Sequence, residues 1–145
     1  MQRWRAARLW ACEPFILERL EQRLLLTSAE IIGVIPLANS RAAPVGTDIT
    51  LTYDQNLDGP TVTDQTFAVH RMFTGQLVDP PHGSMITVVG DTIIFNPDND
   101  FDPGELVFVS ATTNIQNTGS EVSDKRVWQF RAGVAGGGGL FTDAA

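Results

Sequence analysis

The sequence predicts an all-β fold, an antiparallel sandwich of about seven short strands. Beyond residue 30, apolar residues recur at every second position in short runs, which is the period of a strand with one buried face. Turns rich in Pro, Gly, Asn and Asp separate these runs, and no helical pattern lies between them. Consecutive strands without intervening helices pack most readily as two antiparallel sheets.

Each expected strand rests on its own pattern. The first, 31–35, is an apolar run ended by a proline, and in the second Ile49, Leu51 and Tyr53 alternate with threonines. A Gly-Asp pair at 90–91 predicts a hairpin with a type II′ turn, because glycine is preferred at the first turn position. The expected strands are 31–35, 48–53, 66–71, 85–89, 92–95, 106–111 and 127–131, with a minor edge strand over 76–78.

Alternation also predicts which side chains face the core. Phe67 and Val69 share one face of their strand, and Trp128 and Phe130 share one face of the last strand. Aromatic residues in such positions are interpreted as core rather than as a sugar-stacking platform.

The segments that flank the sandwich have different patterns. Residues 14–28 place leucines and Ile16 at helical spacing with charged residues opposite, so we expect an amphipathic helix within a leader, 1–29. Residues 133–145 are Gly-rich and read as a flexible tail or linker. The sandwich is expected over 30–132.

Charge and composition exclude several classes. The net charge of −7 comes from the residues after 35, which hold thirteen acids against five basic residues, so nucleic acid is not an expected partner. No apolar run approaches the length of a transmembrane helix. Cys12 is the single cysteine, which excludes an intrachain disulfide. It ends a Leu-x-Ala-Cys sequence like a lipoprotein signal, but the apolar stretch before it is too short, and no export signal is clearly visible.

The leader carries a resemblance. LERLEQRLLL, residues 17–26, is similar to the LEPR-type motif near the N-termini of large bacterial surface proteins, with Gln22 in place of the proline. That resemblance implies a role in export or surface placement.

Residues 31–131 resemble the bacterial Ig-like domain of S-layer and other surface proteins. The pieces that match, in order, are IIGVIPLANS, PVGTDITLTYDQNLD, TVTDQTFAV, GDTIIFNP, FDPGE and VWQFRAG. Two positions depart from the family pattern: Ser40 stands where Asn-Gly is common, and Val107 takes the place of a tyrosine. The resemblance implies an Ig-like antiparallel β-sandwich.

Two sets of residues are candidates for a site. Asp98, Asp100 and Asp102, with Glu105 nearby, follow the D-x-D-x-D spacing of calcium loops, although glycine and glutamate are missing where an EF-hand needs them. Capping of turns by these aspartates is the alternative. No other cofactor is expected.

The second set is apolar. With Val107, Val109 and Ala111 inside, the side chains of Leu106 and Phe108 face outward, as does that of Ile94 on the neighbouring hairpin. An exposed apolar cluster of this kind indicates an interface with a neighbouring module or surface protein. Coverage by the leader helix or the Gly-rich tail, and simple exposure, are the alternatives.

The sequence holds no catalytic motif, and His70 and His82 are isolated, so we do not expect an enzyme. The prediction is a non-catalytic Ig-like structural or spacer module of a bacterial cell-surface or secreted protein, located outside the cell. Two alternatives stay open: a calcium-dependent adhesion or carbohydrate-binding module centred on 98–105, and an accessory domain of an extracellular hydrolase.

Overall fold

The structure, a computed structural model, describes residues 27–78 and 85–134. The expected leader helix, the LEPR-like motif, Cys12, His82 and most of the Gly-rich tail lie outside the described residues. Those expectations therefore stay predictions.

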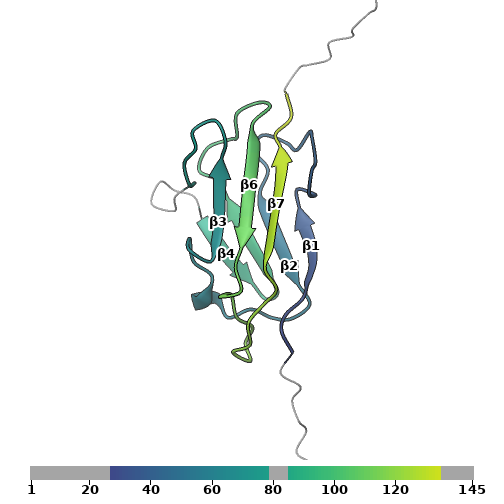
Figure 1. Ribbon diagram of the computed structural model, residues 1–145, viewed down its shortest axis with the longest axis vertical. Coiled ribbons are helices and arrows are strands. Elements are labelled where there is room, and N and C mark those ends of the chain that lie inside the picture. Colours follow the sequence, from purple (N-terminus) through teal and green to yellow (C-terminus); the bar gives the residue numbers. More distant parts are fainter. Residues whose placement is uncertain (1–26, 79–84, 135–145) are drawn as a thin grey trace, which may run out of the picture.

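The described residues form seven strands in two antiparallel sheets that pack face to face (Figure 1). One sheet has the order β1-β2-β5-β4 and the other β3-β6-β7, which is the strand order of a constant-type Ig sandwich. The predicted all-β class and the number of strands are therefore confirmed. The strands are β1 Ile31–Ile35, β2 Ile49–Tyr53, β3 Phe67–Arg71, β4 Met85–Val89, β5 Thr92–Asn96, β6 Leu106–Ala111 and β7 Arg126–Arg131.

Strand bounds differ from the prediction by one residue at most, with one exception. The expected edge strand over 76–78 is reduced to a single antiparallel bridge between His70 and Leu77. The chain turns back at Gly75, whose N–H donates to the carbonyl of Arg71 at 2.9 Å and whose φ of 65° suits glycine. Two further backbone bonds pair the described part of this segment with β3, from Arg71 N–H to the Gln76 carbonyl at 3.1 Å and from Val78 N–H to the Val69 carbonyl at 2.7 Å.

The core lies between the sheets and is built from the alternating inward positions. Phe67 on β3 connects the two layers: its ring centroid lies 6.4 Å from that of Phe95 on β5 and 6.3 Å from that of Trp128 on β7. All three side chains are buried, as predicted for Phe67 and Trp128. Aromatic residues of this size contribute a large share of the apolar area that folding removes from water.

The β4–β5 hairpin has the turn that the sequence predicts. Gly90 has a φ of 64°, whereas Asp91 is not among the residues with positive φ. Positive φ at the first turn position alone is the type II′ pattern, which matches the twist of a two-residue hairpin.

The connection from β1 to β2, two strands of the same sheet, passes over to the other sheet and runs beside β7 before it returns. Asn39 donates its N–H to the carbonyl of Gln129 at 2.7 Å, and the N–H of Arg131 donates to the carbonyl of Ser40 at 2.7 Å. Ala43 forms a parallel bridge with Ala132. At the other end of the sandwich, Ala29 forms a parallel bridge with Ser123, so the first and last parts of the domain pair in parallel at both ends.

A buried asparagine holds the loops at the end where the described chain begins. The side chain of Asn117 donates to the Thr27 carbonyl at 3.1 Å and to Gln55 Oε1 at 2.8 Å, while its Oδ1 accepts the N–H groups of Gly119 and Glu121. Because these bonds satisfy a buried amide fully, they specify one loop arrangement.

Candidate functional site

A buried ion pair lies at the opposite end, where β3 ends and β6 begins. Glu105 is fully buried. Its Oε2 accepts Arg71 Nη2 at 2.7 Å, Arg71 Nε at 3.0 Å and the backbone N–H of Asp102 at 3.0 Å. The other oxygen, Oε1, has no hydrogen bond within the described residues, although the nearby backbone N–H of Phe73 still favours the charged carboxylate.

Arg71 ties this carboxylate to the acidic loop 97–105. Its Nη2 also donates to the backbone carbonyl of Asp100 at 3.2 Å and contacts Asp102 Oδ2 at 3.3 Å. The guanidinium carbon lies 5.5 Å from the ring centroid of Phe101, a cation–π contact. Phe101 is itself buried and meets Phe130 edge to face at 5.6 Å, so the loop is anchored from both sides.

The environment shifts the pKa values of both partners. Burial raises the pKa of Glu105, but the hydrogen bonds from Arg71 and Asp102 and the charge of Arg71 outweigh it, so the pKa lies below its usual range. The hydrogen bond to Glu105 raises the pKa of Arg71 against the opposing effect of burial. Both groups are therefore charged in the folded protein.

The lowered pKa predicts acid-sensitive stability. Because the folded state binds this proton less readily than the unfolded state, the contribution of Glu105 is complete above about pH 4.3 and is lost as the pH falls through the folded value. Urea unfolding between pH 7 and pH 3 should therefore show a loss of stability below about pH 4.3 that Glu105→Gln removes. Glu121→Gln, outside this cluster, is the control; an unchanged pH slope in Glu105→Gln would contradict the assignment.

The residues expected to bind calcium are distributed around this ion pair. Glu105 points into the core towards Arg71, and Asp102 is also paired with Arg71. Asp100 faces Gly46, where an added Cβ would meet its Oδ1 at 2.9 Å, and Asp98 Oδ2 accepts the Asn99 amide at 3.2 Å. Within 27–78 and 85–134, no group of three or more His, Cys, Asp or Glu residues is placed to hold a metal. Calcium binding stays a prediction.

The residues expected to form an interface lie on two different surfaces. Ile94 is on β5 between the buried Ile93 and Phe95, so it faces outward from the four-stranded sheet. Leu106 and Phe108 are on β6 and face outward from the three-stranded sheet. Their outward directions were predicted correctly, but the outer faces of a sandwich point away from each other, so the three residues form no single cluster.

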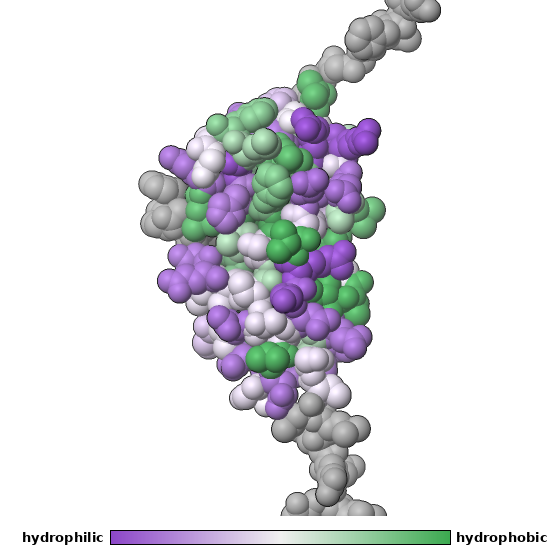
Figure 2. Space-filling model, in the orientation of Figure 1, coloured by the Kyte–Doolittle hydropathy of each residue, from purple (hydrophilic) through white to green (hydrophobic). Residues whose placement is uncertain are grey.

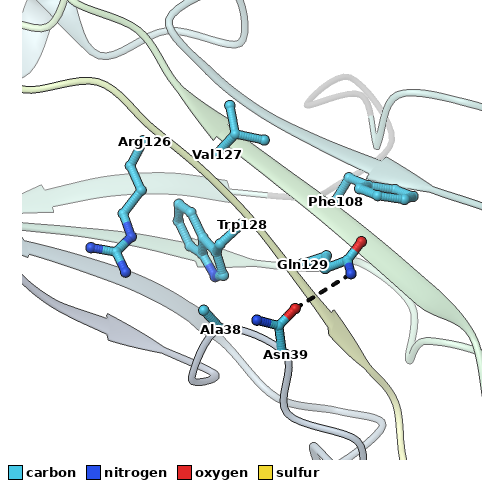
Figure 3. Close-up of a pocket in the computed structure, with 7 residues that line it drawn as sticks. All are labelled: Ala38, Asn39, Phe108, Arg126, Val127, Trp128 and Gln129. Carbon is cyan, nitrogen blue, oxygen red and sulfur yellow. Dashed lines mark hydrogen bonds between the residues drawn. The ribbon is translucent and has the colours of Figure 1, made fainter.

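A groove runs along β7, between that strand and the connection that follows β1. Two hollows of about 310 Å³ each meet at Asn39 and Gln129. Figure 3 shows Gln129 reaching towards Asn39, with Nε2 to Oδ1 at 3.4 Å, and the indole of Trp128 between Arg126 and Ala38. In Figure 2, apolar and hydrophilic residues are interspersed over the face formed by β3, β6 and β7. The lining residues are Ala38, Asn39, Ser40, Arg41, Leu106, Phe108, Arg126, Val127, Trp128, Gln129, Phe130 and Arg131.

Neither Arg71 nor this groove was identified from the sequence. A signal for Arg71 was present, because the alternation that turns Phe67 and Val69 inward also turns residue 71 inward. The groove gave no comparable signal, since it joins residues about ninety positions apart, Asn39 and Gln129.

Two antiparallel sheets in this strand order, with a core filled by alternating side chains, define an Ig-like β-sandwich domain. The sequence profile of the bacterial Ig-like domain matches residues 27–132. The chain therefore belongs to the bacterial Ig-like domain family, as the resemblance indicated. No match is found among curated protein sequences.

Solved structures share the fold at low sequence identity. An L,D-transpeptidase from Mycobacterium smegmatis superimposes with a TM-score of 0.51 and 13% identity over 74% of this chain and 41% of that chain. The N-terminal part of the bacterial S-layer protein SbsC gives 0.50 and 13%, over 74% and 24%. CopC from Methylosinus trichosporium OB3b gives 0.51 and 10%, over 74% and 95%.

The chain thus spans less than half of the transpeptidase and about a quarter of the S-layer structure. Identities in this range indicate a common fold and nothing about activity. Among the described residues, no helix has the length and apolar character needed to cross a membrane.

Proposed function

We propose that the chain is a non-catalytic structural module of a bacterial surface or secreted protein, acting as a spacer between other parts. The observation that carries this proposal is the position of the two ends of the described chain, residues 27 and 134, at opposite ends of the sandwich (Figure 1). A domain with this geometry adds its full length between whatever precedes and follows it. The larger size of the transpeptidase and S-layer chains is consistent with such use of the fold as one part among several.

The buried ion pair supports a structural role over a catalytic one. A general acid or base needs a carboxyl group that can reach substrate and exchange a proton near neutral pH. Glu105 is fully buried, and its pKa is lowered by the hydrogen bonds of Arg71 and Asp102 despite its burial. These contacts fix the loop 97–105 onto the end of β3.

The outer face of the four-stranded sheet is the surface that best fits a neighbouring module. The strands β1, β2, β4 and β5 contain no charged residue. On the outer face, Ile35 and Thr50 pair across one strand boundary, and Thr50 and Thr87 flank Ile94. An uncharged face of isoleucine and threonine can be covered without burying an unpaired charge, which lowers the free-energy penalty of contact.

An exchange experiment tests the spacer role. Bacterial cells that make the protein with residues 27–132 replaced by an unrelated Ig-like sandwich of the same strand order should display it at the unaltered level, measured by protease accessibility on intact cells. Deletion of the same residues should reduce display, because the spacing is lost. If the exchange lowers display as much as the deletion, the spacer role is wrong and a specific surface is required.

The same cells test the proposed contact face. Ile94→Lys should reduce display through loss of the module contact, whereas His70→Lys, at an exposed position of β3 on the opposite sheet, should leave it unchanged. Equal effects of the two variants, both folded by circular dichroism, would exclude the four-stranded face as the contact surface.

A further inference from the structure

The edge of β7 that faces away from β6 is open near the start of the strand, at Val127. Backbone groups of Gln129 and Arg131 point away from β6 and bond to the connection 39–43. Because successive residues of a strand alternate in direction, the N–H and C=O of Val127 point to the same edge. At the other end of the strand, the edge is paired again where Asp124 donates to the Ala29 carbonyl at 2.9 Å. Within the described residues nothing pairs with Val127.

The groove beside this open edge is lined in part by the buried side chain of Trp128. Trp128 is only 4% exposed, and its indole Nε1 has no hydrogen-bond partner among the described residues. Figure 3 shows this nitrogen at the end of the ring nearer Ala38, where the hollow of about 310 Å³ lies. A buried indole N–H without an acceptor is unfavourable, but Nε1 exposes less than 1 Å² of surface, so a ligand in the groove would reach it only if the ring moved.

The rim of the groove is basic although the protein is acidic. The described residues include five Lys and Arg residues, of which Arg71 alone forms ion pairs within 4.0 Å. The other four are exposed and lie along β7 or opposite its end: Arg41, Lys125, Arg126 and Arg131. Four positive charges without carboxylate partners favour a negatively charged ligand.

From the open edge and the basic rim we propose that the edge of β7 around Val127 binds an extended, acidic segment of a partner protein by strand addition. The backbone of Val127 would supply the hydrogen bonds, the basic rim the charge selection, and the exposed side chains of Val127 and Phe108 the apolar contact. This site lies on the three-stranded sheet and is separate from the four-stranded face proposed for module contact.

The test uses the full chain and a short fluorescein-labelled peptide of alternating Glu and Val, followed by fluorescence anisotropy. A peptide of alternating Lys and Val is the matched probe. The acidic peptide should bind at least about tenfold more tightly, and its affinity should fall as salt is raised.

Val127→Pro is the decisive variant, because it removes the N–H that faces the open edge and leaves the β6–β7 ladder intact. It should weaken peptide binding by about tenfold or more, whereas Val127→Ala keeps the N–H and should retain most of the affinity. If the proline variant fails to fold, the double variant Lys125→Gln/Arg126→Gln is the test. It should weaken binding of the acidic peptide and reduce the dependence of that binding on salt.

Three results would overturn the proposal. They are equal binding of the two peptides, unchanged binding in Val127→Pro or in the charge variant, and dimerisation of the unliganded chain that Val127→Pro abolishes in sedimentation. The last would assign the edge to a second copy of this chain.

Discussion

Replacing Arg71 by methionine is expected to lower the free energy of unfolding by about 3–5 kcal/mol, the range seen when one partner of a buried pair is removed. The reason is the position of Glu105, which is fully buried and receives two hydrogen bonds from Arg71 at 2.7 and 3.0 Å. Without the guanidinium, the carboxylate must stay charged and unpaired in the core or take up a proton. Urea denaturation at pH 7 measures the change.

Two further variants distinguish the loss of the Arg71–Glu105 ion pair from a general effect of substitution on stability. Arg41→Met removes an exposed arginine and should change stability by less than about 0.5 kcal/mol. The double variant Arg71→Met/Glu105→Met should recover much of the loss, because no charge is then left buried. If Arg71→Met is no more destabilising than Arg41→Met, the ion pair does not contribute as described.

Phe67→Ala is expected to destabilise the domain by about 3–5 kcal/mol, through lost burial and the cavity that remains. Phe67 is 1% exposed and contacts aromatic rings of both sheets, Phe95 at 6.4 Å and Trp128 at 6.3 Å between centroids. Its removal therefore opens the layer between the sheets, where few side chains are able to move in. The thermal midpoint should fall by more than about 12 °C, at roughly 4 °C or more per kcal/mol.

Phe108→Ala is the matched control, since Phe108 is 36% exposed and faces outward on β6, the neighbour of β3. It should cost clearly less than Phe67→Ala, because about a third of its surface stays in water and its removal leaves no closed cavity between the sheets. Similar losses in the two alanine variants would mean that the sheets are held together elsewhere.

Alternation predicted the strands well because it reports a local property, namely which face of a strand is apolar. Leu106–Ala111 is a clear example: Val107, Val109 and Ala111 are buried, and the intervening side chains face outward. No partner strand has to be known to make that prediction.

Alternation also places Arg71 and Glu105 on inward faces, but it does not show that the two side chains meet. Residue 71 falls on the inward face of β3, and Glu105, two residues before Val107, falls on the inward side of β6. Arg71 is in register with Val107, so the two charges meet only once β3 and β6 are known to be neighbours. The sequence alone therefore presented Glu105 as a candidate metal ligand.

Alternation also could not predict which of the two sheets each strand joins. Ile94 and Phe108 are separated by a short stretch of sequence, which suggested one surface. The chain instead crosses between sheets after β5, so β5 pairs with β2 and β4, and β6 pairs with β3 and β7. Crossovers of this kind are set by the tertiary packing of both layers and not by local pattern.

The parallel pairing of the first and last segments has a consequence for mechanical force. If the two ends of the domain are pulled apart, the segment 29–43 and the segment 123–133 slide past each other along their length. The hydrogen bonds at Ala29, Asn39, Ser40 and Ala43 are then loaded together in shear, and no single bond can open ahead of the others. An antiparallel pairing of the same segments would unzip one bond at a time, so this domain should resist stretching along its long axis.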